Sequence, residues 1–178
     1  MKTRKMFTLV FAAVICTMTG CFRPDDSAAG AAAGKLVGYW EVSHIAEDNY
    51  QYDIYEDGTT GEPNSVIDSY DVICDDGRKE WGIMRFTESM MTYVATDDPE
   101  LVGILDVPVP YTFDGKKLVS AFIQLDHGPG FAEVEFKNDD CMELYILDEG
   151  YLYKDNGKRN GYEKCQTWTT FRRVTNEN

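Results

Sequence analysis

Five cysteines and two histidines carry the most reactive side chains of this chain, and their spacing limits the chemistry that they could do together. A structural zinc site needs four Cys or His ligands, which commonly occur in pairs such as Cys-x-x-Cys. No such pair is present, and His44 and His127 lie far apart in the sequence. We therefore expect no metal site.

The acidic residues do not form a catalytic or calcium-binding motif either. Asp75-Asp76-Gly77 and Asp155-Asn156-Gly157 offer oxygen ligands, but neither continues into the spaced acids of an EF-hand loop. Both sit between strand-like runs, where Asp-Gly and Asn-Gly are typical of turns. There is no nucleophile-elbow serine, no His-Glu-x-x-His and no phosphate-binding loop. We expect a protein that is not an enzyme and has no cofactor.

Cys21 differs from the other cysteines because a recognisable N-terminal segment leads to it. Three basic residues precede an apolar run, Met6 to Ile15, in which only Thr8 is polar. The run is shorter than the roughly 20 residues that a spanning helix needs. It has the length and flanks of a secretory signal. Met18-Thr19-Gly20 then supply one hydrophobic and two small residues directly before the thiol of Cys21.

This arrangement resembles the lipobox of bacterial lipoproteins. In that family the thiol is alkylated with a diacylglycerol, the chain is cut before the cysteine, and the new amine is acylated, commonly with palmitate. The resemblance implies that residues 1–20 are a signal peptide and that lipidated Cys21 attaches the mature chain to a membrane. Phe22 and Arg23 lack the aspartate that marks retention in the inner membrane. We therefore expect a lipid anchor in the outer membrane of the bacterial cell envelope, with its periplasmic or surface face left open.

Residues 21–35 are predicted to be the lipidated N-terminus and a flexible linker, because the segment is rich in Ala, Gly and Asp and has no apolar periodicity. Removal of residues 1–20 takes away three basic residues and no acidic one, which changes the formal net charge from −14 to −17. So acidic a chain should not bind nucleic acid. It should also be repelled by anionic lipid, so that membrane attachment depends on the acyl chains.

Residues 36–175 predict one all-β domain. In the first strand, Leu36, Gly38, Trp40, Val42 and His44 share one face. Alternation with period two, and enrichment in β-branched and aromatic residues, recur in further runs at 66–74, 80–86, 90–96, 109–113, 117–125, 131–137, 142–146 and 165–174. Polar turn clusters separate these runs, which favours an antiparallel sandwich or barrel. The pairing of Cys74, Cys141 and Cys165 stays open, because three connectivities are available.

The opening strand resembles the Gly-x-Trp strand of lipocalins, and the order of the later strands is similar to that of lipocalin-like domains in small bacterial lipoproteins. The resemblance implies an up-and-down antiparallel barrel of about eight strands, closed at one end. It also implies that an arginine of the last strand packs across the tryptophan at the closed base. The residues concerned are Gly38 and Trp40, with either Arg172 or Arg173 within about 6 Å of the ring. The longer loops 59–65 and 97–110 depart from the simplest barrel.

Two kinds of binding are compatible with this barrel. If the barrel is hollow, it binds a small apolar ligand. The lining would come from Trp40, Val42, His44, Tyr70, Trp81, Phe86, Phe113, Phe122 and Phe136, with loops 59–65 and 97–110 at the rim. If the barrel is filled by its own aromatics, the protein is instead a docking or inhibitory module for an envelope partner. Exposed tyrosines would then form the contact surface: Tyr50, Tyr52, Tyr55, Tyr151 and Tyr153.

Overall fold

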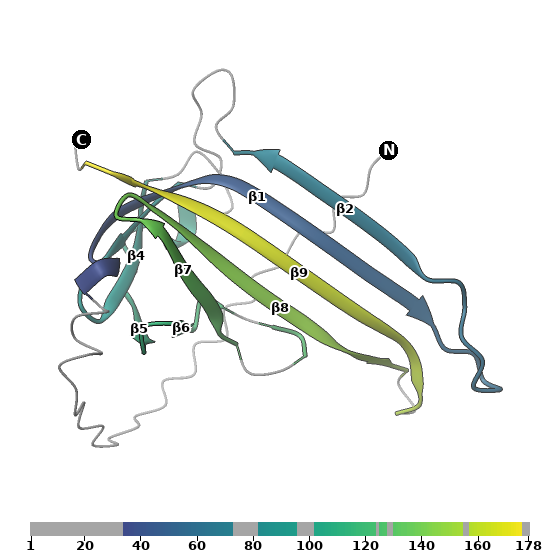
Figure 1. The fold of residues 1–178 in the computed structure, drawn as a ribbon. Helices are drawn as coiled ribbons and strands as arrows, with labels where there is room; N and C mark the ends of the chain where they lie inside the picture. Colours follow the sequence, from purple (N-terminus) through teal and green to yellow (C-terminus); the bar gives the residue numbers. More distant parts are fainter. Residues whose placement is uncertain are drawn as a thin grey trace.

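The structure, a computed structural model, describes residues 34–72, 82–95, 102–123, 125–127, 130–154 and 157–175. It contains nine antiparallel strands and one short 3-10 helix (Figure 1). They are β1 (Gly38–Asp53), β2 (Asn64–Asp71), β3 (Ile83–Phe86), β4 (Met90–Ala95), η1 (Val102–Ile104), β5 (Val109–Phe113), β6 (Lys117–Ser120), β7 (Ala132–Asn138), β8 (Cys141–Tyr153) and β9 (Arg159–Val174).

Eight of these strands close an antiparallel barrel, as the sequence predicted. The order is β1-β3-β4-β5-β6-β7-β8-β9, and β9 pairs with β1 to complete the ring. From β3 onward the strands follow one another up and down. Where β4 and β5 share only two paired positions, a parallel bridge between Tyr93 and Leu105 continues the contact.

β2 is the ninth strand and lies outside the barrel. It pairs with the second half of β1, from His44 to Gln51, whereas β3 pairs with the first half, from Gly38 to Glu41. β8 and β9 also run on past the barrel, so that four strands in the order β2-β1-β9-β8 form a projecting sheet (Figure 1). We call this part, residues 44–53, 64–71, 145–153 and 159–170, the sheet extension.

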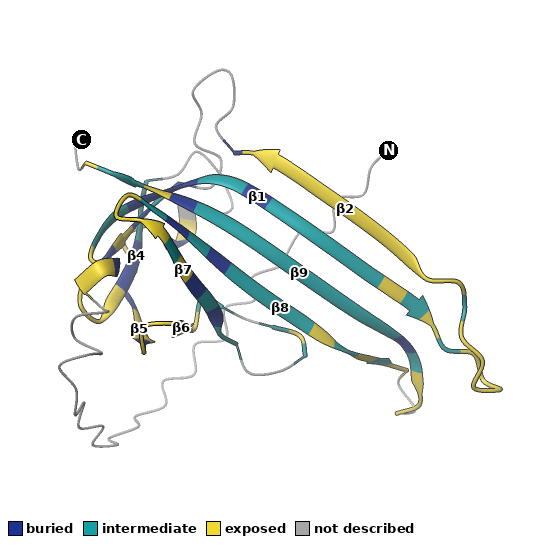
Figure 2. Ribbon diagram, viewed as in Figure 1, coloured by how far each residue is buried: buried dark blue, intermediate teal, exposed yellow. Residues whose placement is uncertain are grey.

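The hydrophobic core lies in the barrel and ends at the start of the extension, where Ile45 and Val72 are its last buried members. Its largest fully buried side chains are Trp40, Phe86, Leu36, Leu118 and Met142. In Figure 2 the buried positions gather at the barrel, the extension is mostly half-buried, and β2 is exposed along its whole length. Beyond Ile45 the inward positions of β1 carry polar residues such as Glu47, so the end of the core reflects a change in residue type along a strand that itself continues.

Three details of the predicted organisation are wrong. The first strand was expected from Leu36, but residues 34–36 form a helical turn, with Leu36 fully buried, and β1 begins at Gly38. The connection at 59–65 joins β1 to β2 at the far end of the extension, where Ile54 bridges to Thr60, and so does not rim the barrel (Figure 1). β1, β8 and β9 are longer than their periodic runs, because their continuations alternate between two polar or aromatic faces. The predicted signal peptide, residues 1–20, and residues 21–33 of the predicted linker 21–35, with Cys21, lie outside the described residues.

Candidate functional site

The interior of the barrel is occupied by its own side chains. Of the predicted lining residues, Trp40, Val42, Phe86 and Phe113 have exposed fractions between 0 and 7 %. Phe122 and Phe136 are half-buried and pack against the same cluster. A side chain that lined a water-sized void would be accessible to water, so these values indicate close packing around them rather than a ligand chamber. Trp81 and Cys74 lie outside the described residues.

The base of the barrel brings Gly38, Trp40 and Arg173 together. The guanidinium carbon of Arg173 lies 4.2 Å from the centre of the Trp40 ring, which is fully buried. Arg173 also donates from Nη1 to the carbonyl of Val37 (2.8 Å) and from Nη2 to that of Lys35 (2.8 Å). Trp40 Nε1 donates to the carbonyl of Leu36 at 2.7 Å. These bonds hold the segment before β1 across the bottom of the barrel.

The glycine of the Gly-x-Trp motif has a steric reason in this arrangement. Gly38 has a φ of +138°, and a Cβ at this position would lie 2.5 Å from Nη1 of Arg173. A larger residue would therefore strain the backbone and displace the guanidinium. Arg172, the other predicted arginine, points to the opposite face, where its Nη2 donates to Oε2 of Glu41 at 3.0 Å.

Two predicted lining residues lie outside the barrel, and a β-bulge explains the first. The register of β1 against β9 shifts between Val42 and His44, so that Ile45 takes the inward position with an exposed fraction of 4 %. His44 consequently faces outward, with Nδ1 2.9 Å from Oδ1 of Asp71 and Nε2 3.0 Å from Oγ of Ser69. Tyr70 is on β2 and is 40 % exposed. The prediction that these two line the barrel is wrong.

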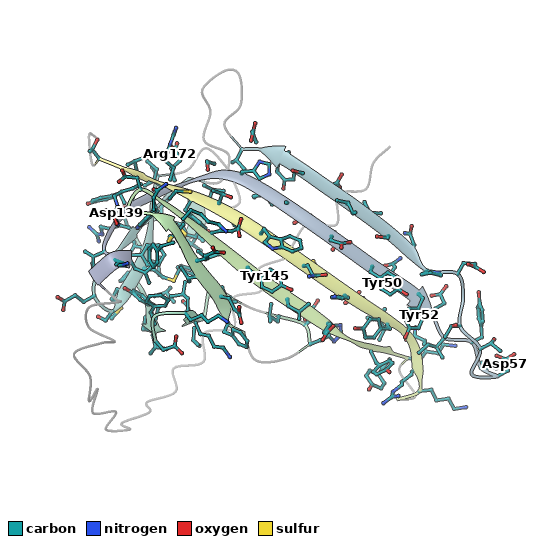
Figure 3. The ribbon with its side chains drawn as sticks, in the orientation of Figure 1. Tyr50, Tyr52, Asp57, Asp139, Tyr145 and Arg172 are labelled. Atoms are coloured by element: carbon teal, nitrogen blue, oxygen red, sulfur yellow. The ribbon has the colours of Figure 1, made fainter. Side chains whose placement is uncertain are left out.

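The outer face of the extension carries a continuous run of tyrosine rings across three strands. Tyr50 and Tyr52 of β1 meet edge to face with centroids 6.0 Å apart. Tyr52 stacks on Tyr162 of β9 at 5.4 Å, and Tyr162 meets Tyr151 of β8 at 5.5 Å. Figure 3 shows Tyr50 and Tyr52 on the extension, far from Arg172 and the barrel base. We call these four residues, Tyr50, Tyr52, Tyr151 and Tyr162, the tyrosine surface.

Polar groups hold the tyrosine surface in place. The guanidinium carbon of Arg159 lies 4.0 Å from the centre of the Tyr151 ring, and Tyr162 Oη donates to Oε2 of Glu149 at 3.0 Å. Burial, and then the hydrogen bond to Glu149, raise the pKa of Tyr162 above its ordinary value. Tyr55 and Tyr153, which are 55 and 58 % exposed, flank the surface. The predicted docking tyrosines thus lie at one end of the molecule.

The sequence did not predict that Tyr162 and Arg159 belong to this surface, because the last strand was expected to begin only at residue 165. The signal that could have found them is the continued alternation of 159–165, in which Tyr162 shares the parity of Trp168. His127 was expected at a loop tip, yet its Nε2 lies 2.9 Å from Oε1 of Glu163. A Cβ on Gly150 would lie 2.5 Å from Cγ of His127, so the loop rests directly on β8.

The inner face of the extension is polar and acidic. Glu47 of β1 stands directly opposite Asp68 of β2. Burial, and then the charge of Asp68, raise the pKa of Glu47. The pKa of the Cys165 thiol is raised mainly by burial and further by the neighbouring carboxylates. Both Cys141 and Cys165 are free thiols, although Cys74 lies outside the part that the structure describes.

A cleft of about 340 Å³ runs between β8 and the segment that joins β6 to β7. Its walls are Leu125, His127, Phe131, Glu133, Tyr145, Leu147 and Glu149. The backbone amides of Asp126 and His127 donate to the carboxylate of Asp148, which fixes this segment against β8. The cleft is lined by outer-face residues of β8 and is separate from the core of the barrel.

Two further tests of the described part bear on function. None of the described helices is long and apolar enough to cross a membrane. Within the same ranges, no group of three or more His, Cys, Asp or Glu side chains is arranged to hold a metal ion. Comparisons with protein-family models, with curated proteins and with solved structures find no match to this chain.

Proposed function

We propose that this protein is a non-catalytic lipoprotein of the bacterial cell envelope that docks a partner protein on the outer face of its sheet extension. The observation that carries the proposal is the tyrosine surface, a run of four rings on three strands in which each ring contacts the next. Aromatic side chains, and Tyr in particular, are enriched in protein interfaces because a large apolar ring carries a polar tip.

The position of the tyrosine surface supports docking over storage of a ligand. The rings lie beyond the end of the hydrophobic core, so they contribute little to closing the barrel. Cation–π contact with Arg159 and the hydrogen bond to Glu149 restrict the rotamers of Tyr151 and Tyr162 before any partner binds. A surface that is already ordered loses less conformational entropy on binding.

Photo-crosslinking in living cells tests this docking. A benzophenone amino acid replaces Tyr153, which borders the tyrosine surface, or Val119 on β6, which is 47 % exposed and serves as the control position. We expect a discrete protein adduct from position 153 and none from position 119. Tyr52→Ala and Tyr162→Ala should abolish the adduct while the abundance of the protein stays unchanged. An adduct that survives both substitutions would rule out the tyrosine surface as the contact.

The membrane anchor belongs to the same proposal and rests on the sequence that leads to Cys21. Each methylene of an acyl chain contributes about 0.8 kcal/mol on burial, so several long chains give attachment that washing does not reverse. Cys21→Ala should leave the precursor uncut at this site and without lipid. Partition into a detergent phase, with mass spectrometry for lipid, measures both effects. A Cys21→Ala protein that partitions and carries lipid like the wild type would exclude the anchor.

A small-ligand function is the second candidate, and the cleft beside β8 is the observation that favours it. Its volume of about 340 Å³ falls in the range of small-molecule sites, and Leu125, Phe131 and Tyr145 give it apolar walls. A broad pool of small apolar compounds, screened by melting temperature, tests this candidate. A ligand at 100 times its dissociation constant adds about 2.7 kcal/mol, which moves the melting temperature by several degrees.

A further inference from the structure

β2 is the edge strand of the extension, and no other described strand pairs with its outer edge. Among the described residues it pairs only with β1, and all eight of its residues are exposed. Ile67, at its centre, is 75 % exposed. Natural edge strands are commonly blocked by Pro, by Lys or by a covering loop, because an open edge pairs readily with another chain. The segment Asn64–Asp71 contains neither Pro nor Lys.

The hydrogen-bond pattern identifies which backbone groups of β2 face outward. The amide of Val72 donates to the carbonyl of Ser43 at 3.1 Å, so these two residues form a hydrogen-bonded pair. In an antiparallel ladder such pairs recur at every second residue. Val66 and Asp68 therefore bond to β1, whereas the N–H and C=O groups of Ser65, Ile67 and Ser69 point away from it.

The two faces of β2 differ in the side chains that they would offer to an added strand. On the outer face, Ile67 would be covered by an apolar neighbour. On the inner face, Asp68 stands opposite Glu47, and no Lys, Arg or His among the described residues forms an ion pair with either of them. Like charges directly opposite one another destabilise a sheet, and a cation in the next strand would relieve this repulsion.

We propose that β2 takes up an extended, basic segment of a partner protein as an additional strand of the sheet. This inference rests on the proposed docking function and names the chemistry of the partner. The outward N–H and C=O groups of β2 supply the main-chain bonds, and the alternate side chains supply specificity. Apolar residues of the partner lie over Ile67, and its Lys or Arg residues lie beside Asp68 and Glu47. The net charge of −14 also steers a basic segment toward this chain.

A designed peptide tests the inference on the full-length protein in detergent. The probe is a capped peptide of about eight residues that alternates Lys with Val, and the matched control peptide alternates Glu with Val. Fluorescence anisotropy of the labelled peptides gives both affinities. We expect the Lys peptide to bind at least about tenfold more tightly than the Glu peptide at low salt, with the difference shrinking as salt is added. Equal binding of the two peptides, or no binding of either, would overturn the inference.

Three variants separate backbone pairing from side-chain contact. Ile67→Pro removes one outward N–H and should weaken the Lys peptide at least about tenfold, whereas Ile67→Ala removes only the side chain and should weaken it less than about threefold. Asp68→Lys should reverse the preference between the two peptides. Hydrogen exchange at Val66 and Asp68 shows whether β2 still pairs with β1 in the proline variant. If β2 no longer pairs with β1 in the proline variant, the test depends on Asp68→Lys alone. An unchanged preference for the Lys peptide over the Glu peptide in that variant then contradicts the inference.

The outcomes for the docking function and for the edge strand can be told apart. Tyr52→Ala should leave peptide affinity within about threefold of the wild type, because Tyr52 is not part of the outward edge of β2. If the cross-link at position 153 persists in cells but the peptide does not bind β2, the docking function stands and the basic strand is excluded. If the peptide binds and the cross-link is absent, the tyrosine surface is excluded.

Discussion

Three strands, β1, β8 and β9, run through both the barrel and the sheet extension, and their inward residues change character halfway along. Within the barrel these positions hold Trp40, Val42, Met142, Leu144 and Phe171, all almost fully buried. Beyond Ile45 the same face of β1 continues with polar residues, among them Glu47. Since apolar burial is the main stabilising contribution, the barrel should hold the fold together while the extension is free to serve contact with other molecules.

The largest expected difference between the two regions concerns their tryptophans. Trp40→Ala removes a fully buried ring together with its contacts to Arg173 and Leu36, and should lower the free energy of unfolding by about 3–5 kcal/mol. Trp168→Ala is the matched control, because Trp168 is half-buried on the outer face beside Tyr145. It should cost about 1–2 kcal/mol. Urea unfolding measures both, and equal losses would contradict a core confined to the barrel.

The next effect concerns the closed base. Gly38→Ala forces a residue with a side chain into a φ of +138° and toward Nη1 of Arg173, and should cost about 1–3 kcal/mol. In an Arg173→Ala background the steric part of this loss should disappear and the backbone part should remain. A double-mutant cycle on urea midpoints gives the coupling energy. A Gly38→Ala protein as stable as the wild type would show that the base tolerates a side chain there.

The sequence could predict the barrel and its base because both depend on strong local patterns. Each of the eight later runs overlaps one of the strands β2 to β9, although β8 ends seven residues after its run and β9 begins six residues before its run. The Gly-x-Trp motif pointed to Gly38, Trp40 and an arginine. Alternation could not choose between Arg172 and Arg173, since apolar residues occur at both parities of that segment. It also failed at His44, because a bulge inserts one residue and reverses every later face of the strand.

The sheet extension was harder to foresee for a different physical reason. Its strands alternate between aromatic and acidic positions, and neither face is a conventional apolar stripe. The tyrosine surface is assembled from three strands that are distant in sequence, with Tyr52 opposite Tyr162 and Tyr162 opposite Tyr151. Such contacts depend on register, and a single sequence does not specify register where no core fixes it.

A smaller effect is expected where the loop that carries His127 rests on the extension. Gly150→Ala places a Cβ within 2.5 Å of the imidazole, so the loop must move and the contact between His127 and Glu163 is lost. We expect a loss of about 1 kcal/mol in the free energy of unfolding. Gly103→Ala is the control, because a Cβ there meets nothing within 4 Å. In a His127→Ala background Gly150→Ala should be neutral, and a persistent loss would place the strain elsewhere.

The smallest effect should be a gain in stability in the extension, with a defined pH dependence. Burial, and then Asp68, raise the pKa of Glu47 in the folded state above its ordinary 4.5. The charged carboxylate is therefore a penalty to folding at pH values above the folded pKa, and the penalty fades as the pH falls through that value toward 4.5. Because Glu47 is only half-buried, Glu47→Gln should stabilise the protein at pH 7 by less than about 1 kcal/mol. This gain should vanish below pH 4.5.

Urea midpoints at several pH values measure the stability gain of Glu47→Gln, with Glu62→Gln in the exposed β1–β2 connection as the control. A gain that persists in acid would show that the amide stabilises the strand by another route, and that repulsion between Glu47 and Asp68 does not weaken this edge of the sheet.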